Sequence, residues 1–598
     1  MTTDLGDGGR RPLKAWVRAL ERTAPIAKSP FVTLPVVIER LADKLGTASA
    51  LIADSESLTY SALNELSHRY ARWALRQNVA PGDVVALVMP NCPAYVAIWL
   101  GITRVGGVVA LVNSNLPPAA LAHSIKIVTP KQVIIASELE GTLVGALPLL
   151  PPGGRYWVHG DGSHGFPNID SDAEHYAGNP LGNAEYQPPS LADRALCIYT
   201  SGTTGLPKAA NVSHFRLMQW SQWFAGLMDI GPADRMYNCL PMYHAIGGVV
   251  AIGAPLVAGG SVVIRERFSA SRFWDEVAHW DCTLFQYIGE LCRYLVQSPP
   301  HAREAQHRIR LCCGNGLRAD VWGEFKRRFR IPHILEYYAA TEANFSLFNC
   351  EEKPGAIGRI PAFLAQRSAV ALIKVDIETG TPVRDDSGFC LRCSGDEPGE
   401  AVARIDDDGS TLGSRFEGYT DKEATDRKVL RNVLASNDAW YRTGDLMRQD
   451  EQGFFYFIDR LGDTFRWKGE NVSTAEVAQA LASCPGVIDA VVYGVPLPGT
   501  EGRAGMAALV IGDGFDLIAF RSHLADRLPD YARPLFLRIC GEFATTSTFR
   551  PKSHELSREG YDPSVIRDEL YFDDRDRAAF LKLDAALYER IVSRRIRL

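Results

Sequence analysis

Short apolar runs alternate with longer, partly polar stretches along most of this 598-residue chain. Residues 84–90 (VVALVMP) and 107–114 (GVVALVNS) have the length and β-branched composition of buried strands, whereas residues 93–106 (PAYVAIWLGITRVG) have the length of a buried helix. Strands that alternate with helices are typical of α/β folds with mostly parallel sheets. We therefore expect an α/β fold of several lobes, because a chain of this length exceeds a single core.

The pattern changes near residue 460. A loop-rich stretch, 442–460, precedes a helix-like segment at 471–483 and strand-like segments at 489–497 and 505–512. Such a restart is typical of a new domain. We predict an N-terminal extension over residues 1–34, a large domain of several subdomains over 35–460, and a small mobile C-terminal α/β domain over 461–598. Residues 147–190 are rich in Pro, Gly, Asp and Asn and predict one long irregular excursion.

The first helix-like segment allows two interpretations. One helical face carries five apolar residues: Leu13, Trp16, Val17, Leu20 and Ala24. Basic residues mostly lie elsewhere: Arg11, Lys14, Arg18 and Arg22. The helix could lie on anionic lipid at the inner face of the membrane, as a peripheral contact, or dock on its own protein, because the same periodicity serves both.

Residues 245–264 are uncharged over the length of a membrane span, but five glycines and a proline favour a buried, turn-rich part of the core. The first residues, MTTDLGDGGRRPLKAW, lack the apolar stretch of a secretory signal. The twelve cysteines are scattered, several within apolar runs, as in proteins of a reducing compartment. We therefore expect a cytoplasmic protein.

Charge and cysteine spacing argue against two classes of partner. The formal net charge of −6 and the pI near 6.2 provide no electrostatic reason to bind DNA or RNA. The CxxC pair, Cys390 and Cys393, has no second pair at zinc spacing, so we expect core cysteines rather than a metal or redox site.

The stretch YTSGTTGLPK, residues 199–208, carries the first chemical signal. It is not a Walker motif, since Gly202 and Gly205 are too close together and Ala209 follows Lys208. Glycines let the backbone approach an anion, hydroxyl groups donate hydrogen bonds and Lys208 adds charge. These features favour a phosphate-binding loop over a plain flexible turn. By contrast, GDGSHG at 160–165 precedes FPNIDSD, which cannot begin the helix that a dinucleotide site requires.

Five motifs occur in one order along the chain: YTSGTTGLPK (199–208), LPMYH (240–244), YYAATE (337–342), YRTGDL (441–446) and DRLGDTFRWKGENVSTAEV (459–477). Together they resemble the adenylate-forming superfamily of acyl-CoA synthetases, peptide-synthetase adenylation domains and luciferases. Further segments, such as YIGELCRYL, CGNGLR and GRAGMAALV, are most similar to its fatty acid transport protein and very-long-chain acyl-CoA synthetase branch. The likeness extends from about residue 35 to the C-terminus.

The resemblance implies a reaction in two halves. A carboxylate attacks the α-phosphorus of ATP to form acyl-AMP and pyrophosphate, and the thiol of coenzyme A then attacks the acyl carbon. ATP, Mg²⁺ and CoA are implied as cofactors, with a long-chain or otherwise bulky hydrophobic carboxylic acid as the substrate. Residues 35–460 would form the adenylation domain.

The resemblance also implies roles for individual residues. Thr204 and Lys208 would neutralise developing charge, Glu342 would hold Mg²⁺ and Thr341 would bond a phosphate oxygen. His244 would lie at the acyl entrance, with a buried core histidine as the alternative. The implied nucleotide- and CoA-side positions are Thr200, Ser201, Gly202, Thr203, Thr204, Gly205, the adenine-lining Gly314, Asn315 and Gly316, Tyr338, Ala339, Thr341, the ribose-binding Asp445 and Arg460, the hinge Gly462, and Lys468, Gly469 and Glu470 on the CoA face.

One position departs from the family pattern. The catalytic lysine of the family belongs in a motif that relatives write TGTFK, and this chain has TSTFR, which places Arg550 there and Lys552 two residues later. A planar guanidinium differs from an ammonium in reach and angle. Three interpretations stay open: an acyl-CoA ligase that uses Arg550 or Lys552, a nucleotide- and acyl-CoA-binding lipid-uptake protein with impaired adenylation, and an adenylating ligase with an acceptor other than CoA.

Overall fold

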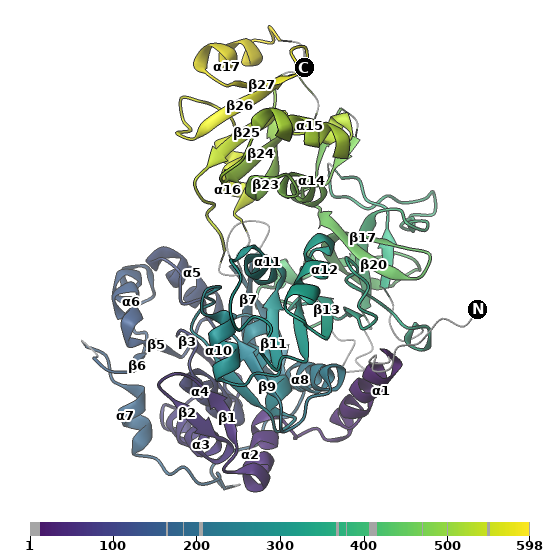
Figure 1. Cartoon of the computed structure of the whole chain (residues 1–598). Coiled ribbons are helices and arrows are strands. Elements are labelled where there is room, and N and C mark those ends of the chain that lie inside the picture. The colour runs from purple at the N-terminus through teal and green to yellow at the C-terminus, as the bar shows by residue number, and fades with distance from the viewer. Residues whose placement is uncertain are drawn as a thin grey trace. The chain divides into compact units, whose positions relative to one another are not determined.

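The computed structural model describes residues 12–596 apart from residues 163–164, 183, 202–206, 366–369, 378, 406–415, 469, 499, 501 and 547–550 and the side chain of Ser201. The chain divides into two units (Figure 1). Unit 1 comprises Met1–Ser368 and Arg404–Leu430, and unit 2 comprises Ala369–Ala403 and Arg431–Leu598. The expected α/β architecture is confirmed, since helices and mostly parallel strands alternate through unit 1.

A six-stranded sheet of unit 1 has the order β6-β5-β3-β4-β7-β8. Its strands are β3 (Val84–Val88), β4 (Val108–Leu111), β5 (Gln132–Ala136), β6 (Tyr156–His159), β7 (Arg194–Ser201) and β8 (Pro207–Ser213). All neighbours are parallel except the hairpin β7–β8. Every residue of β3 is buried, as expected for a continuous apolar strand with helices on both faces.

Helices cover this sheet on opposite faces. The face that contains Val85 and Leu87 packs on α4 (Pro93–Arg104) and α3 (Tyr60–Arg76), and the face that contains Ala86 packs on α5 (Pro118–Val128) and α6 (Glu140–Ala146). Helices α3 and α4 cross closely, because a Cβ at Gly101 would lie 2.5 Å from the Ser67 carbonyl oxygen.

A second run of strands in unit 1 has the order β15-β14-β13-β12-β11-β9-β10-β1-β2. Its strands are β1 (Ser49–Ile52), β2 (Ser57–Thr59), β9 (Arg235–Asn238), β10 (Ser261–Ile264), β11 (Leu284–Ile288), β12 (Leu311–Asn315), β13 (His333–Ala339), β14 (Ser346–Asn349) and β15 (Gly358–Arg359). The helices of this part are α2 (Leu34–Leu45), α8 (His214–Met228), α9 (Ala251–Leu256), α10 (Phe273–His279), α11 (Gly289–Gln297), α12 (Ala319–Arg328) and α13 (Lys422–Asp426). The central strands are parallel, so their carboxyl ends meet at one edge.

Residues 246–264 form a π-helical turn (Ile246–Val250), α9 and β10, and they are mainly buried. The prediction of a turn-rich core segment is confirmed. Within the described ranges, none of the helices is both long enough and apolar enough to cross a bilayer.

The prediction of one irregular excursion over residues 147–190 is wrong in part. Strand β6 pairs with β5 there, and helix α7 (Ile169–Glu174) follows, capped by the Asn168 side chain. The segment FPNIDSD, which was expected not to begin a helix, therefore does begin one, since α7 starts within it at Ile169; this helix has six residues and does not start directly behind Gly165.

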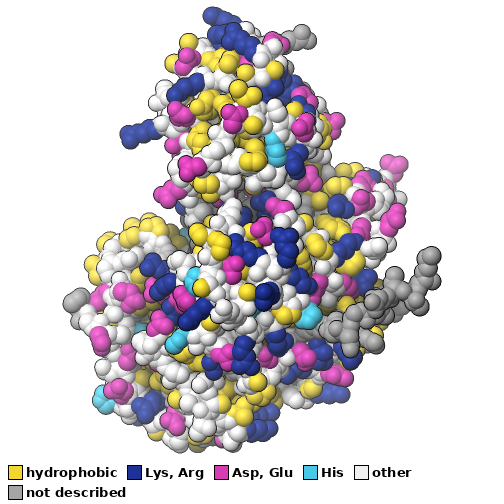
Figure 2. Space-filling view, in the orientation of Figure 1, with side chains coloured by type: hydrophobic (Ala, Val, Ile, Leu, Met, Phe, Trp, Pro, Cys, Tyr) yellow, Lys and Arg dark blue, Asp and Glu magenta, His cyan; other side chains and the backbone are white. Residues whose placement is uncertain are grey.

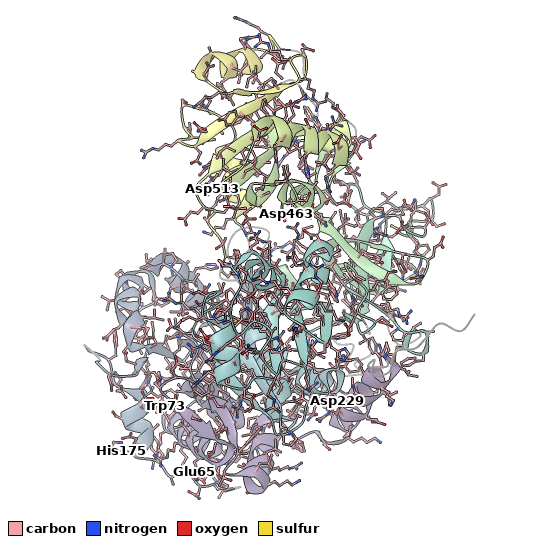
Figure 3. All side chains as sticks on the ribbon, in the orientation of Figure 1. Glu65, Trp73, His175, Asp229, Asp463 and Asp513 are labelled. Carbon is pink, nitrogen blue, oxygen red and sulfur yellow. The ribbon has the colours of Figure 1, made fainter. Side chains whose placement is uncertain are left out.

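Helix α1 (Pro12–Thr23) docks on α8 (Figure 1). The ring of Trp16 lies 5.8 Å from Trp223 and 5.7 Å from Phe348 between centroids. Arg18 pairs with Asp229, labelled in Figure 3, at 3.2 Å. The docking alternative is therefore confirmed. The buried face was predicted incorrectly, since Leu13 is 58% and Val17 40% exposed.

Unit 2 contains the run β16-β17-β19-β20, with β18 on β19, and a five-stranded sheet β23-β24-β25-β26-β27. Its strands are β16 (Val370–Ile373), β17 (Gly399–Ile405), β18 (Val429–Arg431), β19 (Ala439–Gln449), β20 (Phe454–Arg460), β21 (Phe465–Trp467), β22 (Glu470–Val472), β23 (Val487–Pro496), β24 (Arg503–Ile511), β25 (Phe536–Cys540), β26 (Glu569–Asp574) and β27 (Ala579–Lys582). Its helices are α14 (Thr474–Ala482), α15 (Leu517–Arg527), α16 (Ser553–Glu559) and α17 (Ala585–Val592). Apolar residues between Phe465 and Ile591 form a core of their own.

Two predictions from composition can be compared with the surface and the core. Nine of the twelve cysteines are buried and all twelve are free, so the interpretation as core residues is confirmed for most of them. On the face shown in Figure 2, basic and acidic side chains are interspersed rather than gathered by sign.

Because α1 docks through one face, we expect substitutions on its buried and exposed faces to differ in their effect on stability. Trp16→Ala should lower the free energy of unfolding by about 3–5 kcal/mol, because it removes a buried aromatic side chain. Leu13→Ala should change it by less than about 0.5 kcal/mol, since that side chain is exposed. Urea denaturation of both variants checks this, and equal effects would contradict the docking.

Candidate active site

The hairpin β7–β8 brings together the two ends of the expected phosphate loop. Its register pairs Thr200 with Lys208 and Ser201 with Pro207. Gly202, Thr203, Thr204 and Gly205 lie outside the described residues. The hairpin therefore positions Lys208 and Thr200 at the base of the loop.

Tyr419 joins three residues from two separate motifs. Its hydroxyl donates to Glu342 Oε1 at 2.6 Å, and the Lys208 ammonium lies 5.9 Å from its ring centroid. Burial and the Glu342 carboxylate raise the pKa of Tyr419, while a hydrogen bond from Thr200 lowers it. The sequence analysis missed this residue, because no periodicity or motif marks it.

Residues 417–420 are held against β8 by backbone bonds. Asn211 N donates to Gly418 O at 2.9 Å, and Thr420 N donates to Ala209 O at 2.9 Å. The Glu417 carboxylate accepts from Ser213 N at 2.7 Å, next to the N-terminus of α8. These contacts fix the Tyr419 ring over the hairpin.

Arg216 connects the same region to the motif at 337–342. It is buried on α8, and its Nη1 donates to the Thr341 carbonyl oxygen at 3.0 Å while its Nε lies 3.8 Å from Glu417. Thr341 and the buried Glu342 are thus held from α8 and from Tyr419. Arg216 was also missed, since a lone arginine on an apolar helix carries no sequence signal.

Two of the three residues expected to line adenine, Gly314 and Asn315, end strand β12, and Gly316 follows it. Strand β12 lies beside β13, where Gly314 pairs with Glu336, and Tyr338 and Ala339 end β13 at the same carboxyl edge. Gly316 has φ +77°, which favours glycine. Gly314 has a packing reason of its own, because a Cβ there would lie 2.2 Å from the Tyr287 carbonyl oxygen.

Glu336 lies beneath this loop and is buried. Its Oε1 accepts from Leu317 N at 3.1 Å, and its Oε2 accepts from the Tyr287 hydroxyl. Burial raises the pKa of Glu336 to about 8, against hydrogen bonds from Tyr287, Leu317 and Gly316 that lower it. A protonated carboxyl group therefore supports the backbone next to the adenine motif.

His244 follows the segment 240–243 and precedes the π-helical turn. Its ring lies 4.7 Å from that of Tyr243, and Gly248 N donates to its carbonyl oxygen at 2.7 Å. Burial lowers the pKa of His244 to about 4. The ring is therefore neutral at pH 7, which suits an apolar neighbourhood.

In unit 2, the register of β19 and β20 pairs Asp445 directly with Arg460. Arg460 Nε lies 3.4 Å from Asp445 Oδ1. The buried Glu400, missed by the sequence analysis, accepts from Gly444 N at 3.0 Å and forms an ion pair with Arg442. This pair fixes the turn that presents Asp445.

The remaining expected residues of unit 2 lie farther along the chain. Lys468 occupies the β21–β22 turn with φ +51°, and its ammonium lies 5.7 Å from the Trp467 ring centroid. Lys552 precedes α16 and pairs with Glu555 at 3.1 Å. Gly469 and Arg550 lie outside the described residues.

Metal ligands are sparse in the part of the chain that the structure describes. It contains no group of three or more His, Cys, Asp or Glu side chains that could hold a metal. Glu342 offers a single buried carboxylate. Such a site fits Mg²⁺, which usually takes one or two carboxylates and completes its shell with water and phosphate oxygens.

Comparison with known families agrees with the motifs. Residues 38–396 match the AMP-binding enzyme family, and residues 476–550 match the AMP-binding enzyme C-terminal domain. The fold and these motifs define an adenylate-forming enzyme, and the chain belongs to the AMP-binding enzyme family.

Similarity to individual proteins places the chain in one branch of this family. The chain is 38% identical over 567 residues to long-chain fatty acid transport protein 1 of Mus musculus, covering 94% of this chain and 87% of that one. It is 36% identical over 579 residues to long-chain fatty acid transport protein 2 of Rattus norvegicus, covering 96% and 92%. It therefore lies in the fatty acid transport protein branch.

Solved structures share the fold at lower identity. The anthranilate CoA ligase AuaEII in complex with anthranoyl-AMP superposes with a TM-score of 0.75 at 19% identity, covering 88% of this chain and 96% of that one. ATP-bound MatB from Rhodopseudomonas palustris gives 0.73 at 21% identity, covering 88% and 99%. The chain thus has the adenylate-forming fold, with a large N-terminal and a small C-terminal domain.

We expect the Tyr419 hydroxyl to contribute measurably to ATP binding. Tyr419→Phe keeps the ring near Lys208 but removes the bond to Glu342, so ATP affinity should fall by roughly 10- to 100-fold, the value of a hydrogen bond to a charged group. Calorimetry with Mg²⁺ and a non-hydrolysable ATP analogue measures this. The Tyr571 hydroxyl also donates to a glutamate, Glu569, so Tyr571→Phe is the matched control and should bind ATP with unchanged affinity. Normal binding by Tyr419→Phe would contradict the role.

Glu336 predicts a pH dependence of stability. The folded chain keeps this proton up to about pH 8, whereas the unfolded carboxyl group loses it near 4.5, so its stabilising effect is full below pH 4.5 and is lost as the pH rises towards 8. Between pH 5.5 and 7.5, the unfolding free energy of the wild type should therefore fall relative to Glu336→Gln by about 1 kcal/mol per pH unit. Urea denaturation across this range checks the slope, and parallel curves would contradict it.

Proposed function

We propose that this chain is an ATP-dependent acyl-CoA synthetase that activates long-chain or very-long-chain fatty acids, or other bulky hydrophobic carboxylic acids, through acyl-AMP. The observation that carries the proposal is the cluster in which Tyr419 joins Thr200, Lys208 and Glu342. The names of the fatty acid transport relatives support the substrate class. The solved complexes of similar fold with anthranoyl-AMP and with ATP support the intermediate and the nucleotide.

The first half-reaction brings a carboxylate towards a polyanion, so its main cost is electrostatic. Lys208 and the hydroxyl groups of the loop would neutralise charge that develops on the phosphates. Tyr419 engages Glu342 Oε1, and the Glu342 carboxylate would hold Mg²⁺, which would offset the phosphate charge when bound. Thr341 would donate a hydrogen bond to a phosphate oxygen, with Arg216 holding its backbone.

The nucleoside would be held by groups that suit its shape. Gly314, Asn315 and Gly316 would line adenine, with Tyr338 on its other face, and Glu336 would keep the loop in register. Within unit 2, the Asp445 carboxylate would accept from both ribose hydroxyls, a diol that an acceptor pair suits, with Arg460 beside it. His244 would face the apolar body of the acid, because its neutral ring tolerates an apolar surface.

The second half-reaction would use a different arrangement of the C-terminal domain, which we place at residues 461–598. Gly462, with open space around its Cβ direction, would act as the hinge. Lys468, Gly469 and Glu470 would then face CoA.

Arg550 is the residue on which adenylation should depend most. Lys552 is already paired with Glu555, so Lys552→Ala should change carboxylate-dependent ATP–pyrophosphate exchange by less than about threefold, whereas Arg550→Ala should lower it by about 100-fold or more. Exchange with a panel of fatty, sterol side-chain and bile-type acids, with thioester detected by mass, tests the proposal.

The same assay separates the proposal from its alternatives. Absence of exchange in the wild type together with its appearance in Arg550→Lys would favour an adenylation-impaired binding or uptake protein. Exchange without a CoA thioester would favour another acceptor.

A further inference from the structure

A thiol, an imidazole and a carboxylate meet in unit 1, outside the residues assigned to the nucleotide. Cys92 precedes α4, His159 ends β6 and Asp170 lies in α7. His159 Nδ1 and Asp170 Oδ1 are 2.8 Å apart, and the Cys92 thiol is a further hydrogen-bonding partner of the His159 side chain. Because Asp170 engages Nδ1, the other ring nitrogen is left for the thiol.

The carboxylate of this array is fixed from three directions. Besides His159, the Tyr70 hydroxyl donates to Asp170 Oδ1 at 2.8 Å, and Gly160 N donates to Asp170 Oδ2 at 2.8 Å. Tyr70 lies on α3 and Asp170 on α7; Figure 3 labels Trp73 on α3 and His175, which directly follows α7. A carboxylate held in this way orients an imidazole towards a nucleophile.

The ring is charged in this surrounding. Burial lowers the pKa of His159, but hydrogen bonds to Asp170 and Cys92 outweigh burial and raise the pKa to about 10. The half-buried Glu56 also faces His159 and Asp170, and burial raises the pKa of Glu56. A cationic ring at this position can supply a proton to the leaving sulfur of an attacked thioester.

The array lies where open α/β sheets usually bind ligands. Strands β3 and β5 are neighbours, yet the helices that follow them, α4 and α6, pack on opposite faces of the sheet (Figure 1). Such a switch in direction opens a crevice at the carboxyl ends of the strands. Cys92 follows the end of β3, and His159 ends β6 on the far side of β5.

Unmatched donors lie next to the thiol. The Cys92 side chain makes no capping bond to α4, whose first-turn N–H groups have no partner within the helix. The Tyr95 side chain is fully buried, its hydroxyl has no hydrogen-bond partner in the described part of the chain, and it interacts electrostatically with Cys92. A buried hydroxyl without a partner is unfavourable and points to a ligand oxygen at this place.

The array also adjoins the segment that precedes His244. The Asn91 side chain donates to Leu240 O at 2.8 Å and accepts from Met242 N at 2.8 Å. Tyr95 interacts electrostatically with Tyr243 as well as with Cys92. An acyl group near residues 240–244 would therefore lie close to the thiol.

We propose that Cys92 is a nucleophile that accepts an acyl group from an acyl thioester. The Cys92 thiolate attacks the thioester carbonyl carbon, whose developing oxyanion faces the Tyr95 hydroxyl and the first turn of α4. The bond to the CoA sulfur breaks, and that sulfur takes the proton held by His159, which leaves S-acyl-Cys92, free CoA thiol and a neutral imidazole. The thioester can come from solution, so the step does not depend on the ligase activity proposed above.

The test uses the full chain with palmitoyl-CoA and without ATP. Peptide mass spectrometry should find one palmitoyl group on Cys92, removable by hydroxylamine and absent from Cys92→Ser. Cys350 and Cys393 are also partly exposed, so Cys350→Ser and Cys393→Ser are matched controls that should keep the modification. Absence of acylation, or equal acylation of Cys350 or Cys393, would overturn the proposal.

The roles of the neighbours are tested separately. His159→Asn and Asp170→Asn should each lower the rate of Cys92 acylation at least tenfold, with thermal melting to show that the variants are folded. In the wild type, where folding is not in question, iodoacetamide should alkylate Cys92 at least tenfold faster than Cys350. Unchanged rates in the folded variants, or equal alkylation, would overturn activation by His159.

Discussion

The site depends on one hydrogen bond between segments that are far apart in the sequence. The Tyr419 hydroxyl binds Glu342 across 77 residues, and its ring covers the Lys208 ammonium. Without this tyrosine, the buried Glu342 carboxylate would lose a hydrogen bond and the Lys208 ammonium would lose the neighbouring ring. With it, the end of the motif at 337–342 and the β7–β8 hairpin share one support, which also bonds Thr200.

A single side chain likewise holds the turn that contains Asp445. One buried glutamate, Glu400, binds both the Arg442 guanidinium and the Gly444 amide, so the backbone of the motif is set before any ligand arrives. Electrostatic catalysis benefits from such preorganisation, because groups that are already placed need not reorganise as charge develops.

The fold class and the burial of residues 246–264 were predicted correctly from the sequence, because these depend on local composition and periodicity. The order of the motifs can be read directly from the sequence. It missed Tyr419, Arg216 and Glu400, which act through contacts with residues distant in sequence and carry no spacing signal of their own. It also misjudged the buried face of α1. Leu13 and Val17 fit the helical period as well as Trp16 does, and the aromatic partners Trp223 and Phe348, unknown from the sequence, decided which side is covered.

The docking of α1 on α8 also affects the segment that α8 holds through Arg216. Helix α8 carries Arg216 near its start, where the guanidinium grips the Thr341 backbone, and its Trp223 rests on the first helix of the chain. Helix α1 therefore supports α8 and, through Arg216, the Thr341 backbone. Removal of α1 would therefore weaken the support of residues 337–342.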